Sequence, residues 1–254
     1  MEQRWPDRLW IVRHGESAGN VARNLARAAG HARIDIAMRD ADVPLSSLGR
    51  QQSQALARWF AALPAEERPD CVLVSPYLRA RETAELVATH GELGVAHREF
   101  VSDERLREKE FGVLDRLTET GIAEHYPEQT EHRRILGKFY HRPPGGESWC
   151  DVILRLRSVL DTVSLHFAAR RVLIVTHQVV VLCLRYLLEN LDEASILAID
   201  RDGDVANCSV TEYRFDPDRG VRGGMILARY NFVAPIERTG VAVTSEPDAK
   251  VAAR

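Results

Sequence analysis

The chain has 254 residues and a mass of 28.6 kDa, enough to bury a substantial core in one large domain or two small ones. Apolar residues make up 45% and charged residues 28% of the sequence, a composition that excludes collagen-like, coiled-coil and disordered proteins. The 34 basic and 37 acidic residues give a formal net charge of −3, which argues against a nucleic-acid-binding or membrane-surface protein.

The cysteines and the start of the chain indicate the compartment. The cysteines form no Cys-x-x-Cys pair, so they predict neither a zinc site nor a disulfide framework. The first residues contain no apolar signal region, and the longest apolar run, Val179 to Leu184, is too short to cross a bilayer. We therefore expect a cytoplasmic protein with no membrane or nucleic-acid partner.

Three segments share one pattern, in which a short apolar run is followed by polar residues and then by a helical stretch. The runs cover residues 8–12, 71–74 and 172–175, and helical periodicity follows the second and third over residues 77–89 and 179–189. Short aliphatic runs bounded by turn signals are typical of buried strands in a parallel sheet. The alternation of strands and helices predicts an α/β fold.

Two amphipathic helices and a hairpin complete the expected elements. One helix begins at Ser46 or Ser47 and the other after Ser148, with Asp151 three residues on as in a capping box. Residues 208–213 and 225–230 are typical of an antiparallel hairpin. The expected fold is a three-layer α/β sandwich, with helices on both faces of a mostly parallel sheet and an antiparallel edge near the C-terminus. We expect one domain over residues 1–235 and a loose tail over 236–254.

Polar side chains follow each predicted strand where it ends. Arg13 and His14 end the first strand, Ser75 ends the second with Arg79 one helical turn on, and His177 ends the third. In open parallel sheets, ligands bind in the crevice beyond the carboxyl ends of the strands. Four side chains that carry or accept positive charge would meet there, so the sequence predicts a site for a compact anion.

The order of the motifs adds a family resemblance. The stretch from Arg13 to Ser17 (Arg-His-Gly-Glu-Ser), with Asn20 after it, resembles the signature of the histidine phosphatase superfamily, also called the phosphoglycerate mutase-like family. Further matches follow in the family's order, at residues 45–49, 75–80, 83–84, 106–108, 112, 145–148 and 176–177. The resemblance covers residues 8 to 215 and is closest to broad-range phosphatase members.

The resemblance implies a reaction through a covalent intermediate. His14 would be the nucleophile and form a phosphohistidine, a role that suits an imidazole because it is nucleophilic when neutral near pH 7. Its other ring nitrogen must then be held by an acceptor, and we expect a backbone carbonyl. Glu108 would protonate the leaving alkoxide and later activate water. Glu104 and Glu110 lie in the same charged segment and remain alternatives for this role.

The remaining polar groups would bind the phosphoryl oxygens. Arg13 and Arg79 would grip them, protonated His177 would add a third donor, and Asn20 and the backbone amide of Gln178 would complete the site. Phosphoryl transfer needs mainly positioning and charge stabilisation, which these groups supply. We therefore expect neither a metal nor another cofactor.

Weaker signals concern the substrate. Gly15, Ser17, His141 and Arg142 are candidates for substrate contacts, although a serine that opens a helix is usually only its cap. Residues 21–44 and 113–144 are expected to set specificity, but their pattern does not reveal the natural substrate.

Three functions are compatible with these residues. The favoured one is a metal-independent phosphatase for small phosphomonoesters. The second is a cofactor-dependent phosphoglycerate mutase. The resemblance implies that a mutase would carry a longer insertion here, with extra basic residues that retain a bisphosphate. It is disfavoured because the interval from Glu108 to Gly146 is short and offers only His132-Arg133-Arg134 for that role. A non-catalytic phospho-ligand binding protein is disfavoured because every catalytic position is filled. A homodimer is also compatible with the sequence, because the edge hairpin and the tail could form its interface.

Overall fold

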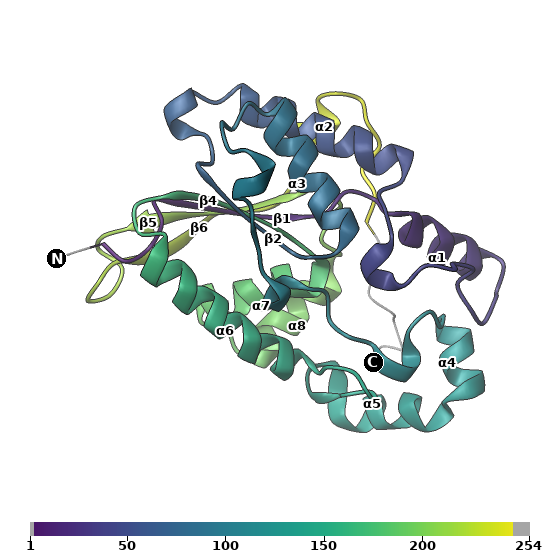
Figure 1. Cartoon of the computed structure of the whole chain (residues 1–254). Helices are drawn as coiled ribbons and strands as arrows, with labels where there is room; N and C mark the ends of the chain where they lie inside the picture. The colour runs from purple at the N-terminus through teal and green to yellow at the C-terminus, as the bar shows by residue number, and fades with distance from the viewer. Residues whose placement is uncertain (1–2, 246–254) are drawn as a thin grey trace.

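A six-stranded sheet forms the centre of the computed structural model, which describes residues 3–245 (Figure 1). The strands lie in the order β3-β2-β4-β1-β5-β6. Their bounds are β1 Arg8–Arg13, β2 Cys71–Val74, β3 Val101–Ser102, β4 Arg171–Thr176, β5 Val210–Asp216 and β6 Gly224–Phe232. β1 to β4 are parallel, whereas β5 and β6 run antiparallel, which confirms the predicted mixed sheet.

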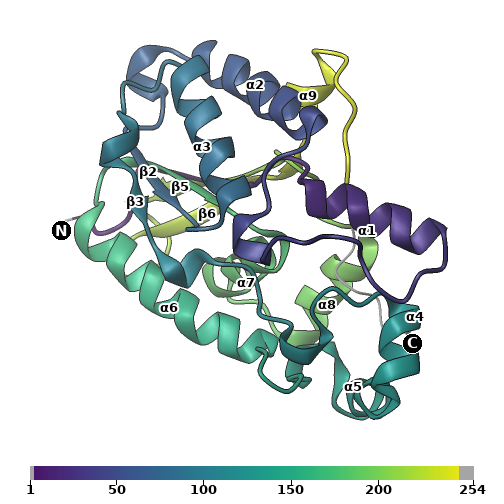
Figure 2. The same ribbon diagram turned by 45° about the vertical axis from the view of Figure 1, so that its right-hand side comes forward.

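Helices cover both faces of this sheet, as predicted. Figures 1 and 2 show α2 and α3 on one face and α6, α7 and α8 on the other, while α1, α4 and α5 stand together at one end. The helices are α1 Ala18–Ala28, α2 Ser47–Ala61, α3 Leu78–His90, α4 Glu119–His125, α5 Pro127–Tyr140, α6 Trp149–His166, α7 Gln178–Glu189, α8 Glu193–Asp202 and α9 Ala234–Glu237.

The first strand shows why the sheet is buried on both faces. Leu9 and Ile11 belong to the core cluster under α6 and α7, and Trp10 and Val12 belong to the cluster under α2 and α3. All four are fully buried. Burying one large apolar side chain contributes about 1.5–3 kcal/mol to folding, so a run that is apolar at every position is stable only between two layers of helices.

The helix starts follow local signals. The side chain of Ser46 accepts a hydrogen bond from the backbone N–H of Gly49 at the start of α2. Ser148 and Asp151 form the expected capping box at the start of α6. The helix predicted from residue 77 begins at Leu78, and the one predicted from residue 179 begins at Gln178.

Several elements carried no sequence signal. β3 has only two residues, both exposed, so it lacks the apolar run that marks the other parallel strands. Within residues 113–144 lie α4 and α5, and Gly137 interrupts α5 with a positive φ of 77°. α8 follows α7 directly and was not predicted as a separate helix.

Part of the segment expected to be a loose tail is packed. Ile236 is fully buried in the cluster under α2, and Val241 packs against the same cluster. The N–H of Asn207 donates to the carbonyl of Thr244. The boundary expected after residue 235 therefore falls within packed structure, while residues 246–254 lie outside the described residues.

The strand register brings the predicted site residues to one edge of the sheet. Arg13 on β1 pairs with Thr176 on β4, and Val74 on β2 pairs with Val175 on β4. The residues that follow these pairs are His14, Ser75 and His177. These three segments are far apart in sequence. They nevertheless leave the sheet side by side, because parallel strands joined by crossover helices end at the same edge.

Candidate active site

His14 and His177 face each other at the carboxyl ends of β1 and β4. Their ring centroids are 5.1 Å apart, with an angle of 64° between the ring planes. Only 3% of His14 and none of His177 is exposed. The backbone N–H of His14 donates to the carbonyl of Thr176 at 2.9 Å, so the sheet itself holds the two segments together. This is the juxtaposition that the sequence predicts.

The tautomer of His14 is fixed by its neighbour. His14 Nδ1 lies 2.7 Å from the carbonyl oxygen of Gly15, so Nδ1 carries the proton and donates it there. His14 Nε2 accepts from Arg79 Nε at 3.2 Å. Burial, with Arg79 and Arg13 nearby, holds the pKa of His14 well below its ordinary value, although the bond to Gly15 opposes this shift. The imidazole is therefore neutral, with its lone pair on Nε2.

Both arginines beside His14 are buried and held by backbone carbonyls. Arg13 Nη1 donates to the carbonyl of Val205, and Arg79 Nη1 donates to the carbonyl of Asp40 at 2.6 Å. Arg13 is 4% exposed and Arg79 is 6% exposed. Guanidinium groups fixed in this way need little reorganisation when an anion binds, which is how preorganised sites stabilise developing charge.

The protonation of His177 depends on whether an anion lies beside the ring. Burial, together with Arg79 and His14, lowers the pKa of His177 well below its ordinary value, so the ring is neutral in the free protein. Its Nε2 lies 2.7 Å from Ser75 Oγ, and its buried Nδ1 has no hydrogen-bond partner among residues 3–245. A dianion beside the ring favours the charged form, so the expected protonated state requires bound phosphate.

A cavity opens beside Arg13, His14 and Arg79, which line it, whereas His177 does not. Its wall comes from the start of α1, the connection between α1 and α2, and the segment after Glu108. Ser17 and Asn20 both line it. Ser17 also caps α1, since its side chain accepts from the Asn20 N–H, and Asn20 Oδ1 accepts from the Ser17 N–H. The capping role expected for Ser17 is confirmed, and it fixes the face of α1 that carries Asn20.

Among the three candidate acids, the structure brings only Glu108 to the cavity. Glu104 and Glu110 are exposed and do not line it. Glu108 Oε1 accepts from the N–H of Lys109 at 2.8 Å. The side chain is half-buried, so it can reach both a substrate and water.

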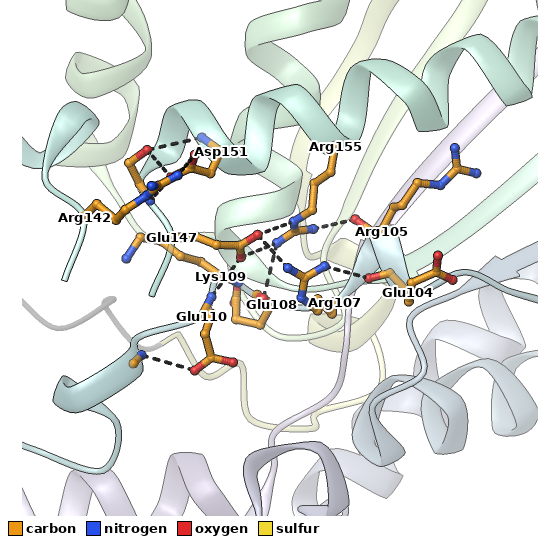
Figure 3. A network of polar contacts seen from close by, with 12 residues as sticks. Glu104, Arg105, Arg107, Glu108, Lys109, Glu110, Arg142, Glu147, Asp151 and Arg155 are labelled. Carbon is orange, nitrogen blue, oxygen red and sulfur yellow. Dashed lines mark hydrogen bonds and ion pairs between the residues drawn. The ribbon is translucent and has the colours of Figure 1, made fainter. Parts of the chain in front are cut away.

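Glu147 anchors the segment that carries Glu108. Its carboxylate accepts from Arg107 Nη2 at 2.7 Å, from Arg155 Nε at 2.9 Å and from the N–H of Glu110 at 3.0 Å (Figure 3). Arg155, on α6, also donates to the carbonyl of Glu108 at 3.3 Å. Burial alone would raise the pKa of Glu147, but these hydrogen bonds and charges lower it, so the carboxylate is ionised.

Five of the sequence candidates do not line the cavity, namely Gly15, His141, Arg142, His177 and Gln178. His141 is buried and its Nε2 lies 3.2 Å from Gln129 Oε1, whereas Arg142 forms an ion pair with Asp151. Neither lines the cavity. The side chain of Gln178 donates to Asp204 Oδ1, and its backbone N–H lies in the first turn of α7, where no intrahelical acceptor exists.

Other residues line the cavity without having been predicted. Most come from the segments already expected to set specificity, and the full set is Gly19, Arg23, Ile34, Ile36, Met38, Asp40, Val43, Phe111, Asp115 and Arg116. Arg116 adopts a positive φ of 60° and donates to the carbonyls of Ile36 and Met38, so it ties the two segments together. No motif marks these positions, because the contact depends on how two connections meet in space.

Two further observations concern metals and membranes. Residues 3–245 contain no group of three or more His, Cys, Asp or Glu side chains placed to hold a metal ion. Within the same range, no helix combines the length and the apolar character that a membrane crossing requires.

The chain belongs to the histidine phosphatase superfamily (branch 1), whose family model matches residues 9–223. It is 32% identical over 189 residues to a 6-phosphofructo-2-kinase/fructose-2,6-bisphosphatase of Gallus gallus, a match that covers 74% of this chain and 34% of that protein. The chain thus spans about a third of that relative. A probable phosphoglycerate mutase GpmB of Photorhabdus laumondii is 27% identical, with 86% and 90% covered.

The fold is also that of solved family structures. The native structure of a mycobacterial glucosyl-3-phosphoglycerate phosphatase matches with a TM-score of 0.67 and 25% identity, covering 89% of this chain and 99% of that one. The resemblance read from the sequence is therefore confirmed for the family and for the fold.

Proposed function

We propose that this protein is a metal-independent phosphatase that hydrolyses small phosphomonoesters through a phosphohistidine on His14. The observation that carries the proposal is the fixed tautomer of His14, with Nδ1 bonded to Gly15 and Nε2 directed at Arg79 beside the cavity. A neutral imidazole with its lone pair aimed into an anion site is an activated nucleophile.

In the first step, His14 Nε2 forms a bond to phosphorus while the ester P–O bond breaks. Arg13 and Arg79 balance the charge on the phosphoryl oxygens, and His177 becomes a further donor once the dianion has raised its pKa. Asn20 and the N–H of Gln178 complete the donors. Protonated Glu108 transfers its proton to the leaving alkoxide, so an alcohol departs.

In the second step, the Glu108 carboxylate removes a proton from water. The water oxygen bonds to phosphorus, the P–N bond breaks, and phosphate leaves with His14 restored as the neutral Nδ1–H tautomer. The two buried arginines supply the fixed positive charge that a divalent cation supplies in other phosphoryl-transfer sites. This charge is the basis for proposing that no metal takes part.

The phosphatase is favoured over a mutase by the position of the basic residues. Arg133 and Arg134 lie on α5 and do not line the cavity, and Arg134 forms an ion pair with Glu131. The basic residues that the mutase alternative would use therefore do not line the cavity. The similarity to a probable phosphoglycerate mutase makes a parallel mutase assay with 3-phosphoglycerate the appropriate comparison.

The test is trapping of the phosphoenzyme by an alkaline detergent quench. Wild-type protein given a radiolabelled phosphomonoester should form an acid-labile, base-stable adduct at His14 and turn over in EDTA. His14→Ala should form no adduct and hydrolyse no p-nitrophenyl phosphate. Turnover by His14→Ala would indicate another nucleophile, strong inhibition by EDTA would contradict metal independence, and wild type without turnover would favour the non-catalytic binding protein.

A further inference from the structure

The C-terminal segment after α9 returns to the catalytic end of the sheet. Figure 2 shows it in yellow, passing α2 on its way toward the start of α1. Thr244, in this segment, makes hydrogen bonds to two buried amide side chains, those of Gln52 on α2 and Asn207 before β5. Gln52 and Asn207 are both fully buried, so neither finds a substitute partner in water.

The hydroxyl of Thr244 bonds to both amides, and the carbonyl of Ala242, two residues earlier in the same segment, also accepts from Gln52 Nε2 at 3.0 Å. Gln52 Nε2 donates to Thr244 Oγ1 at 2.9 Å, and the Thr244 hydroxyl donates to Asn207 Oδ1 at 3.0 Å. The other end of each amide therefore points toward a different partner. The Oε1 of Gln52 is left to accept, and the Nδ2 of Asn207 is left to donate.

Those opposite ends hold the backbone around the nucleophile. Gln52 Oε1 accepts from the N–H of Glu16 at 2.9 Å, and Asn207 Nδ2 donates to the carbonyl of His14 at 3.0 Å. The N–H of Glu16 and the carbonyl of Gly15 belong to one planar peptide group. That carbonyl is the acceptor of His14 Nδ1, so Gln52 orients the group that fixes the tautomer of the imidazole.

We propose that Thr244 is a positioning residue, which holds His14 in its nucleophilic tautomer through Gln52 and Asn207. The role of His14 as nucleophile rests on the proposed function, whereas the hold on its tautomer does not. A hydroxyl is needed because it donates to one amide and accepts from the other. Serine satisfies both requirements, and valine, which is similar in shape, satisfies neither.

The experiment compares Thr244→Val and Thr244→Ser with Thr239→Val as the matched control. The Thr239 hydroxyl donates only to the carbonyl of Ile236, in the same segment but away from His14. Thr244→Val should lower kcat by about five-fold or more with little change in KM, since two hydrogen bonds are lost. Thr244→Ser should restore kcat, and Thr239→Val should leave it unchanged.

The second readout is the ¹⁵N NMR spectrum of the His14 ring, which does not require activity. Wild type should show the Nδ1–H tautomer alone, and Thr244→Val should show a mixture with Nε2–H. If Thr244→Val matches Thr239→Val in both kcat and tautomer, the proposal is wrong. Should the wild type prove inactive, the proposed function fails while the ring spectrum still decides this inference. Thr244→Ala removes the same hydroxyl and replaces the valine variant if that one does not fold.

Discussion

The carboxylate of Asp40 lies 3.1 Å from the guanidinium of Arg79, the group that we propose binds the phosphoryl oxygens. Asp40 comes from a short helical turn, Asp40–Asp42, in the connection between α1 and α2. It is the only acidic side chain that forms an ion pair with Arg79 in the described part of the chain. An incoming phosphate must therefore compete with a resident carboxylate.

Replacement of this carboxylate should tighten anion binding. Asp40→Asn removes the charge, while the backbone carbonyl that accepts from Arg79 stays in place. Exposed ion pairs contribute about 0.2–1 kcal/mol, so the Kd for vanadate should fall by up to about five-fold. Asp42→Asn, in the same turn but paired with exposed Arg39, is the matched control. Weaker binding by Asp40→Asn would mean that Asp40 orients Arg79 instead.

The proton-transfer role of Glu108 can be tested by the choice of leaving group. Glu108→Gln should slow phosphoenzyme formation from alkyl phosphates by about 10²–10⁴-fold, because their alkoxides need a proton. The pre-steady-state burst with p-nitrophenyl phosphate should change little, since p-nitrophenolate leaves without one. Glu104→Gln, a nearby exposed acid outside the cavity, is the control. Equal losses on both substrates would assign Glu108 a structural role.

Gly49 packs against the backbone of Glu16, two residues after His14, and leaves no room for a side chain. A Cβ at Gly49 would lie 1.9 Å from the carbonyl oxygen of Glu16, which is too close for either backbone to remain in place. We expect Gly49→Ala to displace residues 14–16, lower kcat and destabilise the fold by more than about 1 kcal/mol. Gly203→Ala, where no atom lies within 4 Å of an added Cβ, should leave both kcat and the urea unfolding midpoint unchanged.

Anion binding should be coupled to proton uptake by His177. The pKa of this ring is low in the free protein because of burial and Arg79, and a dianion in the site raises it. Protons are therefore taken up on binding, and affinity increases as the pH falls between the two pKa values. Calorimetry with sulfate, whose charge is constant from pH 5 to 8, in buffers of different ionisation enthalpy measures this uptake. His177→Gln should abolish it, and uptake of the same size in that variant would contradict the assignment.

Buried His141 should make the fold sensitive to acid. Burial, with Arg133 and Lys109 nearby, lowers the pKa of His141 to about 4. Between the ordinary value and that pKa the unfolded chain binds the extra proton, so stability is present above pH 6.5 and is lost as the pH falls toward 4. The slope from this group is up to about 1.4 kcal/mol per pH unit. Urea unfolding of His141→Gln across this range should show a shallower pH dependence than wild type, and an equal slope would place the titration elsewhere.

Some outcomes followed from local pattern alone. The runs at residues 8–12, 71–74 and 172–175 became β1, β2 and β4, because runs of this kind are stable only when both faces are covered. Ser148 became the cap of α6 because its side chain bonds within one turn. The polar residues after each strand were correctly expected to meet, since parallel strands end at the same edge of the sheet.

Other outcomes depended on contacts between distant segments. Asp40 reaches Arg79 only because the connection after α1 folds against α3, and no residue type at position 40 announces this. His141 is a candidate for a substrate contact in the sequence, but its ring lies against the side chain of Gln129 on α5. Thr244 lies in a segment of small polar residues that resembles a loose tail, and its partners are 192 and 37 positions away.

The sequence by itself determined the family, the layered fold and the residues that meet at the carboxyl ends of the strands. These follow from hydrophobic periodicity and from short motifs, in which each residue acts on neighbours within a few positions. Only the tertiary structure decided which acid reaches the cavity, in which direction burial shifts the pKa of His177, and which later segment packs beside residues 14–16. Burial, the approach of charges and the direction of amide side chains arise from three-dimensional contacts, and no single stretch of sequence contains them.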